Sequence, residues 1–356
     1  MRFTRLLTIN IYIEMKKISI YGAGQIGLAM MSNIMLNKTD GHAEVVMYSP
    51  HNHKRIEGAY MDLCDACALS GFKSGWIFKP TNDTSEIAES DIVFLCAGDS
   101  PTPEEYAACW EKGIDDRMLQ AQKNISILKA FCADVKKYAP NALVFIVSNP
   151  VDMMSEMARL ELPEHQVYGM GCYLDTARFK REFFEALSND GQKCLYDDIY
   201  QAWILGHHCG TMFLHKESFY FRDKEEYSPE HLAKLVDTAL ARTRNRGLEI
   251  TEVNRAATTK KLNNGAYYAP SLMVVKVITT IVNDKWMQLP LNRPIIAQDG
   301  VPSMVGYQAQ LLCSISQGGV EPCCLKMRGE DAENLIASVE TYEQTKKNFF
   351  SAYEVK

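Results

Sequence analysis

Short, almost continuous apolar runs alternate with longer mixed stretches through the first 150 residues. The apolar runs, each of strand length, are Ile18–Tyr21, Glu44–Tyr48, Asp91–Gly98 and Ala142–Asn149. Helical patterns begin near Leu28 and Arg117. Strands that are buried on both faces give uninterrupted apolar runs, and their alternation with helices is typical of a parallel sheet. We therefore predict an α/β fold with a doubly wound parallel sheet.

The pattern changes after Pro150, where the helical stretches become longer and more charged. Ser228–Arg246 and Asp331–Phe349 are predicted helices, and two strands of antiparallel appearance flank Gly318 and Gly319. Helices segregated from antiparallel strands are typical of an α+β unit. We predict a first domain over residues 15–150 and a second, α+β domain over residues 151–356. Residues 1–14 combine a basic start with a broken apolar middle, and we expect a disordered extension there.

A glycine-rich motif follows the first predicted strand directly. It reads Gly-Ala-Gly-Gln-Ile-Gly over residues 22–27, and a helix is expected after it. Gly22 allows a tight turn, Gly24 lets the backbone approach a pyrophosphate, and Gly27 lets the helix pack on the strand. The helix N-terminus then faces the phosphates. This order indicates the dinucleotide-binding site of a Rossmann domain; a tight turn without a ligand is the alternative.

The end of the second predicted strand bears on the choice of coenzyme. NAD-binding domains place an acidic residue there to bind the adenosine ribose hydroxyls. This strand instead continues into Ser49, with Lys54 and Arg55 a few residues on. A carboxylate would repel a 2′-phosphate, whereas a serine with nearby cations tolerates one. NAD and NADP are therefore both candidate cofactors, and a solvated loop is the structural alternative.

Asp175 and Arg178 stand three residues apart, a spacing that puts both side chains on one face of a helix. A guanidinium binds a carboxylate through two parallel hydrogen bonds. A carboxylate can orient a histidine and stabilise it when protonated. The pair therefore suits an enzyme that anchors a small acid and moves a proton on it. An ion pair on an amphipathic helix is the structural alternative.

Composition narrows the classes of function. The net charge of −6 gives no reason to expect nucleic acid as a partner. No apolar run reaches the ~18 residues that span a bilayer, so we expect no membrane association. The 11 cysteines are odd in number and irregularly spaced, which disfavours a secreted disulfide framework. We expect reduced thiols and a cytoplasmic location.

Taken together, the motifs from Met15 onward resemble those of the lactate/malate dehydrogenase family of 2-hydroxy-acid oxidoreductases. The motifs that carry the resemblance are GAGQIG at 22–27, CAG at 96–98, Arg117 with Asn124, VSNP at 147–150, GCYLDTARF at 171–179, GHHCG at 206–210, GAYYAP at 265–270 and SQGGVE at 316–321. The resemblance implies a Rossmann domain followed by an α+β substrate-binding catalytic domain. It also implies hydride transfer between a nicotinamide cofactor and a small 2-hydroxy or 2-oxo acid of malate or lactate type, and a homodimer or homotetramer.

The resemblance also implies a role for each residue of a candidate site. His208 matches the proton donor and acceptor, and Asp175 the aspartate that orients it. Arg178 matches the arginine that binds the substrate carboxylate, and Arg117 the mobile-loop arginine that polarises the carbonyl. Asn149 matches the asparagine that binds substrate beside the nicotinamide. The cofactor-binding residues implied are Gly22, Gly24, Gln25, Ile26, Gly27, Ser49, Ala97, Gly98, Asn124, Val147 and Asn149.

Substrate choice in this family depends on a mobile-loop residue six positions before the loop arginine. The loop is longer here and aligns poorly, which leaves Trp110, Glu111 and Lys112 as candidates. Trp110 would favour a bulky apolar side chain, Glu111 would repel dicarboxylates and Lys112 would attract them. The sequence does not decide among the three.

The sequence His207-His208-Cys209 consists of metal-ligand types, but adjacent residues on a strand point to opposite faces, so we expect no metal. A thiol at Cys209 beside the active histidine suggests an oxidation switch. Two alternatives to a dehydrogenase stay open. One is a catalytically inactive nucleotide-binding paralogue, suggested by the altered ribose position and loop. The other is an NAD- and metal-dependent glycosidase of related fold, suggested only by Cys172 and His208.

Overall fold

The structure is a computed structural model that describes residues 15–99, 101–102, 104–105, 108, 111, 116–191, 195–208, 210–257 and 265–353. The predicted extension at residues 1–14 lies outside these ranges. No helix in the described ranges is long and apolar enough to cross a membrane.

The amino-terminal half forms the predicted doubly wound parallel sheet. Its strands are β1 (Lys16–Tyr21), β2 (Ala43–Tyr48), β3 (Trp76–Thr81), β4 (Ile92–Leu95), β5 (Leu143–Ile146) and β6 (Val167–Gly169). They lie in the order β6-β5-β4-β1-β2-β3 and every neighbouring pair is parallel. The order reverses between β1 and β4, and ligands of such sheets bind at the carboxyl ends of the strands around this point.

The sheet continues into the carboxyl-terminal half of the chain. The added strands are β9 (Met287–Pro294), β10 (Gln308–Ser316) and β11 (Gly319–Pro322). β9 pairs antiparallel with β6 through Gly169 and Asn292, and β10 and β11 extend the edge. Nine strands of the described chain thus share one sheet, while β7 (Ile204–Leu205) and β8 (Phe213–Leu214) form a separate antiparallel pair. Gly206, directly after β7, bridges this pair to Gln310 of β10. The parallel part reaches β6, beyond the domain boundary predicted at residue 150, and the two-domain division stays a prediction.

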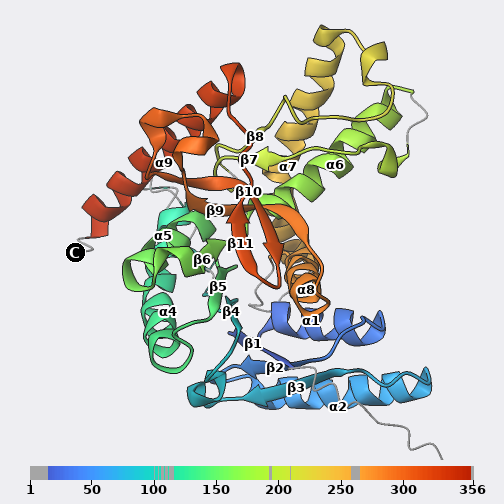
Figure 1. The fold of residues 1–356 in the computed structure, drawn as a ribbon, viewed down its shortest axis with the longest axis vertical. Coiled ribbons are helices and arrows are strands. Elements are labelled where there is room, and N and C mark those ends of the chain that lie inside the picture. The colour runs from blue at the N-terminus through green and yellow to red at the C-terminus, as the bar shows by residue number, and fades with distance from the viewer. Residues whose placement is uncertain are drawn as a thin grey trace, which may run out of the picture.

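Helices cover both faces of the sheet (Figure 1). The helices that follow the first strands are α1 (Gln25–Leu36), α2 (His53–Leu69), α4 (Asp116–Tyr138) and α5 (Val151–Glu161). One buried cluster joins the sheet to α1, α2 and α8 (Tyr268–Val282), and a second joins it to α4, α5 and the end of α9 (Gly329–Tyr353). The α4 helix, predicted to start near Arg117, begins at Asp116.

The remaining helices form a separate lobe beside the carboxyl ends of the strands. The long helices α6 (Cys172–Asn189) and α7 (Pro229–Ala257) pack together, and with the β7–β8 hairpin they enclose their own apolar cluster (Figure 1). The helix predicted at 228–246 therefore continues to Ala257, and the one predicted at 331–349 extends over Gly329–Tyr353. This lobe carries Asp175 and Arg178 on α6, and His208 follows its β7 strand.

Three strands of the large sheet were absent from the sequence prediction. β3 alternates buried and exposed positions and contains Pro80, and it lies at the edge of the sheet, where such a residue is tolerated. β6 has only three residues, too few for a pattern. β9 contains Asn292 and Arg293, both buried, which interrupt its apolar run. The buried polar residues of β9 therefore prevented its recognition as a strand from the apolar pattern.

Candidate active site

The glycine turn lies at the point where the strand order reverses. The amides of Gly22 and Ala23 donate to the carbonyl of Tyr48 at 2.9 and 3.0 Å. Gly22 has a φ of +86°, and a Cβ there would lie 2.2 Å from the Cβ of Ala97, so only glycine fits. A Cβ on Gly24 would meet nothing within 4 Å, and α1 starts there without a side-chain cap. The open N-terminus, with the amides of Gln25 and Ile26, fits a pyrophosphate.

Asn124 of α4 joins the ends of two neighbouring strands. Its Oδ1 accepts from the amide of Asp99 at 2.7 Å, and its Nδ2 donates to the carbonyl of Asn149 at 2.8 Å. Gly98 lies against this amide group, since a Cβ there would be 3.6 Å from it. The predicted cofactor residues after β4 and β5 therefore line one edge, where Val147 is buried and Asn149 is exposed.

Ser49 lies at the end of β2, beside the glycine turn, and is buried. Its hydroxyl accepts from the amide of Asn52 at 3.2 Å, just before α2 begins. Lys54 forms an exposed ion pair with Glu57 at 2.8 Å, while Arg55 is exposed. The end of β2 thus carries no carboxylate. A 2′-phosphate bound there would lie near the start of α2, where Lys54 and Arg55 are exposed.

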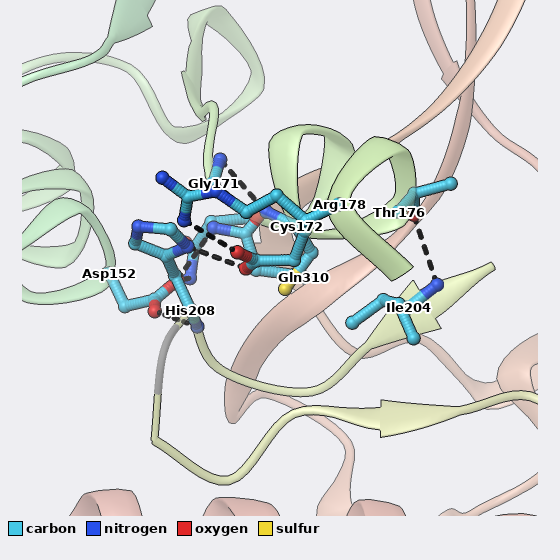
Figure 2. Close-up of polar contacts among 10 residues, drawn as sticks. Asp152, Gly171, Cys172, Thr176, Arg178, Ile204, His208 and Gln310 are labelled. Carbon is cyan, nitrogen blue, oxygen red and sulfur yellow. Dashed lines mark hydrogen bonds and ion pairs between the residues drawn. The ribbon is translucent and has the colours of Figure 1, made fainter. Parts of the chain in front are cut away.

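The strongest feature of the lobe is a histidine–carboxylate pair. Nδ1 of His208 lies 2.6 Å from Oδ2 of Asp175, whose side chain is fully buried, while that of His208 is 8% exposed. Asp175 lies in the first turn of α6, and Thr176 beside it accepts from the amide of Ile204 at 3.0 Å. This bond ties α6 to the strand that leads to His208 (Figure 2). The 33-residue separation along the chain is thereby closed.

Two arginines flank the same carboxylate. Nη1 of Arg178 lies 3.4 Å from Oδ1 of Asp175, as the spacing in the sequence predicted, and its side chain is 12% exposed. Gly247 of α7 lies opposite, where a Cβ would be 3.9 Å from Nη1 of Arg178. Arg117, half-buried at the start of α4, is close enough for its charge to act on Asp175. Arg178 and His208 therefore contact one buried carboxylate, and the charge of Arg117 adds to their effect.

The charges around Asp175 decide its protonation state. Burial by itself raises the pKa of a carboxyl group, but the interaction with His208 and the charges of Arg178 and Arg117 outweigh it, so the pKa of Asp175 is lowered. Asp175 is therefore ionised at neutral pH. An anion held at Nδ1 fixes the tautomer of His208 and directs proton exchange to Nε2.

The backbone of His208 is held by a residue that the sequence analysis missed. Asp152, in the first turn of α5, accepts from the amide of His208 at 2.8 Å and from the side chains of Asn292 and Gln310. The available signal was its position two residues after Pro150, inside an apolar helix face. Distance in the sequence concealed its partners.

The remaining predicted residues are those of the loop before Arg117 and of the segment around His208. Trp110, Lys112 and Cys209 lie outside the described residues; Glu111 is helical and exposed. The expectation that His207 and His208 lie on a strand is wrong, because β7 ends at Leu205 and both histidines follow it in a turn. Their rings diverge nevertheless: Nδ1 of His207 lies 2.9 Å from Oγ of Ser338. Within the described ranges, no three His, Cys, Asp or Glu side chains are grouped to hold a metal.

Comparisons with known proteins identify the family to which this chain is similar. The family model described as lactate/malate dehydrogenase, NAD binding domain, matches residues 16–169. A malate dehydrogenase of Chlorobium chlorochromatii is 30% identical over 81% of this chain and 84% of its own length. A malate dehydrogenase of Francisella philomiragia is 28% identical over 93% of this chain and 97% of its own length.

A solved structure shows the same fold over nearly the whole chain. The lactate dehydrogenase of Eimeria maxima, solved with NADH and oxamate, superposes with a TM-score of 0.75 at 21% identity, covering 96% of this chain and 97% of its own. The predicted fold class, a Rossmann sheet followed by an α+β part, is confirmed. The chain therefore belongs to the lactate/malate dehydrogenase family.

Proposed function

We propose that this chain uses His208, Asp175, Arg178, Arg117 and Asn149 to transfer a hydride between a nicotinamide cofactor and a small 2-hydroxy or 2-oxo acid. Membership of the family supports the reaction type. The observation that carries the residue assignment is the 2.6 Å contact between His208 and the buried Asp175, with Arg178 on the same carboxylate.

The proton transfer is assigned to His208. Nδ1 faces Asp175, so Nε2 is the atom that exchanges a proton with the substrate hydroxyl. When the acid is oxidised, Nε2 accepts the hydroxyl proton, and the ionised Asp175 stabilises the imidazolium that results. In the reverse direction the imidazolium returns the proton to the carbonyl oxygen. A bound nicotinamide cofactor supplies the hydride acceptor or donor.

Arg178 and Arg117 are assigned to different groups of the substrate. A guanidinium fork binds a carboxylate through two hydrogen bonds, and Arg178 lies close enough to the histidine to hold the carboxylate of a 2-hydroxy acid beside it. Arg117 adds a second cation, which would stabilise the charge that develops on the carbonyl oxygen. Asn149, exposed at the end of β5, would hydrogen-bond substrate at the nicotinamide side.

The cofactor site fits a dinucleotide, and we propose NAD as the preferred form. The open α1 N-terminus and the glycine turn suit the pyrophosphate, and the family model that matches is that of an NAD-binding domain. NADP is the second candidate, because Ser49 replaces an acidic residue and Arg55 is exposed nearby. The Eimeria maxima structure was solved with NADH.

Malate or oxaloacetate is the first substrate pair to test, since the similar curated proteins named above are malate dehydrogenases. We further propose a homodimer or homotetramer, which light scattering would measure. An inactive paralogue has less support, because His208 and Arg178 both contact the buried Asp175. The glycosidase alternative has no supporting observation, because Asp175 engages His208 and Cys172 is fully buried.

The experiment follows oxidation of NADH and of NADPH in parallel against oxaloacetate, pyruvate and larger 2-oxo acids. We expect turnover with NADH and a small 2-oxo acid. A tenfold or greater preference for NADPH would reverse the coenzyme assignment. Absence of turnover with every pair, in protein that binds NADH, would favour the inactive paralogue.

A further inference from the structure

Asp152 is a buried carboxylate to which the proposed reaction gives no role. It is 6% exposed, and its hydrogen-bond donors in the described part of the chain are three uncharged N–H groups. Oδ2 accepts from the amide of His208 at 2.8 Å; Oδ1 accepts from Nδ2 of Asn292 at 2.8 Å and Nε2 of Gln310 at 2.7 Å. A charge is retained in such a place only when several donors compensate its lost hydration. These three N–H groups do so here.

The donors are themselves fixed in direction. Oδ1 of Asn292 accepts from Nη1 of Arg159 at 2.7 Å, and Oε1 of Gln310 accepts from the amides of Gly171 and Cys172, both at 3.3 Å. Since a guanidinium and backbone amides can only donate, neither side-chain amide can be reversed without placing its NH₂ against another donor. The side-chain amides of Asn292 and Gln310 therefore donate to Asp152 in a fixed orientation, and Asp152 is the final acceptor of the network.

The network joins the segments that carry the reacting side chains. Asp152 holds the backbone of His208, while Gln310 holds the N-terminal amides of α6, which bears Asp175 and Arg178 (Figure 2). The backbone of Gln310 also exchanges two hydrogen bonds with Gly206, at 3.1 and 2.7 Å, two residues before His208. Asp152 and Gln310 thus fix the position of His208 relative to α6, which carries Asp175 and Arg178.

We propose that Asp152 and Gln310 are positioning residues for the dehydrogenase reaction, which act by fixing the backbone of His208 relative to α6. The inference rests on the proposed function. Asp175 orients the imidazole ring, and Asp152 fixes the backbone from which that ring extends. The hydride and proton transfers tolerate little displacement of the reacting atoms, because a shift near 1 Å costs about 100-fold in rate.

The first test is Asp152→Asn, which preserves shape and removes one acceptor. An amide has one acceptor oxygen, so its NH₂ must face the His208 amide or the two side-chain donors. We expect kcat to fall about 100-fold, while the KM for the 2-oxo acid and the Kd for NADH, measured by fluorescence titration, stay within threefold of wild type.

The second test is rescue by exchange of donor and acceptor. Gln310→Glu alone brings two carboxylates together and should also lower kcat. When Asp152→Asn is combined with Gln310→Glu, the new amide can donate to the new carboxylate, which still accepts from the amides of Gly171 and Cys172. We expect the double variant to recover part of kcat relative to either single variant. Contact with Asn292 stays mismatched, so recovery is incomplete.

A matched control separates positioning from stability. Asp299 is a carboxylate buried to a similar extent, held by Arg293 at 2.7 Å and by the amide of Ile296 at 2.9 Å. Asp299→Asn should lower Tm and leave kcat per folded active site unchanged. The proposal is overturned by a wild-type kcat in Asp152→Asn, or by a double variant whose kcat does not exceed that of the better single variant. If Asp152→Asn does not fold, Gln310→Met decides in the same assay: wild-type kcat overturns the proposal, and a large loss supports it.

A readout without turnover keeps this inference distinct from the proposed function. An amide that donates to a carboxylate has a downfield proton resonance, and that of His208 should move upfield in Asp152→Asn. No movement would overturn the positioning role. Failure of wild-type protein to reduce any 2-oxo acid would instead refute the proposed function, with the amide resonance still reporting on the network.

Discussion

Replacement of Asp175 by asparagine is the most informative single perturbation of the proposed site. The carboxylate is fully buried, lies 2.6 Å from Nδ1 of His208 and 3.4 Å from Nη1 of Arg178. Asparagine keeps the shape and can still accept from Nδ1 through its oxygen. The charge that stabilises the imidazolium is lost. The variant therefore tests electrostatic stabilisation separately from packing.

The structure gives the size of the effect. Charge on a carboxylate and on an imidazolium is spread over each group, so that their centres lie about 4 Å apart, where opposite unit charges interact by about 4 kcal/mol at an effective dielectric of ~20. Because 1.36 kcal/mol corresponds to a tenfold change in rate, kcat/KM should fall about 1,000-fold. The burial of both side chains removes solvent screening as a reason for a smaller effect.

The direction in which the pH–rate profile shifts is an independent test of the same role. Reduction of a 2-oxo acid needs protonated His208, and loss of the neighbouring carboxylate lowers the pKa of the imidazolium. The alkaline limb of the reduction profile should therefore move to lower pH in Asp175→Asn. NADH binding should be unchanged, because Asp175 does not touch the glycine turn.

The assay is steady-state oxidation of NADH by the preferred 2-oxo acid across pH 5–9, with Asp198→Asn as control. Asp198 is another buried carboxylate of the same lobe, paired with Arg222 at 2.8 Å. The control should retain wild-type kcat/KM. An Asp175→Asn enzyme within tenfold of wild type, with its alkaline limb unmoved, would refute the reasoning.

Three further predictions follow. Arg178→Lys loses the fork that binds a carboxylate, so the KM for the 2-oxo acid should rise about 10- to 100-fold with a smaller change in kcat; an unchanged KM would contradict that role. Gly22→Ala forces a Cβ to 2.2 Å from Ala97 at a φ of +86°, and should lower Tm and weaken NADH binding in titration; wild-type values would contradict the fit. Burial lowers the pKa of His207, so the unfolded chain gains a proton first as pH falls below about 6.5, and stability that is complete above that pH is lost below it. His207→Phe should therefore lose less Tm than wild type between pH 7 and pH 5 in calorimetry.

The local pattern predicted the elements that are apolar, long or marked by glycine. β1, β2, β4 and β5 appeared as buried runs, and the glycine turn was recognised from its place between strand and helix. β3, β6 and β9 were missed, because β3 lies at an edge, β6 is short and β9 carries buried polar side chains. These three depend on tertiary partners that no local pattern contains.

In the candidate site, too, local contacts could be predicted from the sequence and long-range contacts could not. The pairing of Asp175 with Arg178 followed from helical spacing, whereas the contact of Asp175 with His208 was implied only by the family resemblance. The contact between Asp152 and Gln310 could not be predicted from the sequence, because the two residues are 158 residues apart and their function depends on the direction of hydrogen bonds. Such a network becomes visible only in three dimensions.

We propose above all that His208 supports direct hydride transfer from the nicotinamide to the 2-oxo carbon. The measurement is a single turnover with NADH that carries deuterium at both C4 positions of the nicotinamide, comparing wild type with His208→Gln and locating the label in the product by mass spectrometry. We expect deuterium at C2 of a 2-hydroxy acid for wild type, and a rate reduced at least ~100-fold in the variant. Unlabelled product, or a His208→Gln enzyme within tenfold of the wild-type rate, would contradict it.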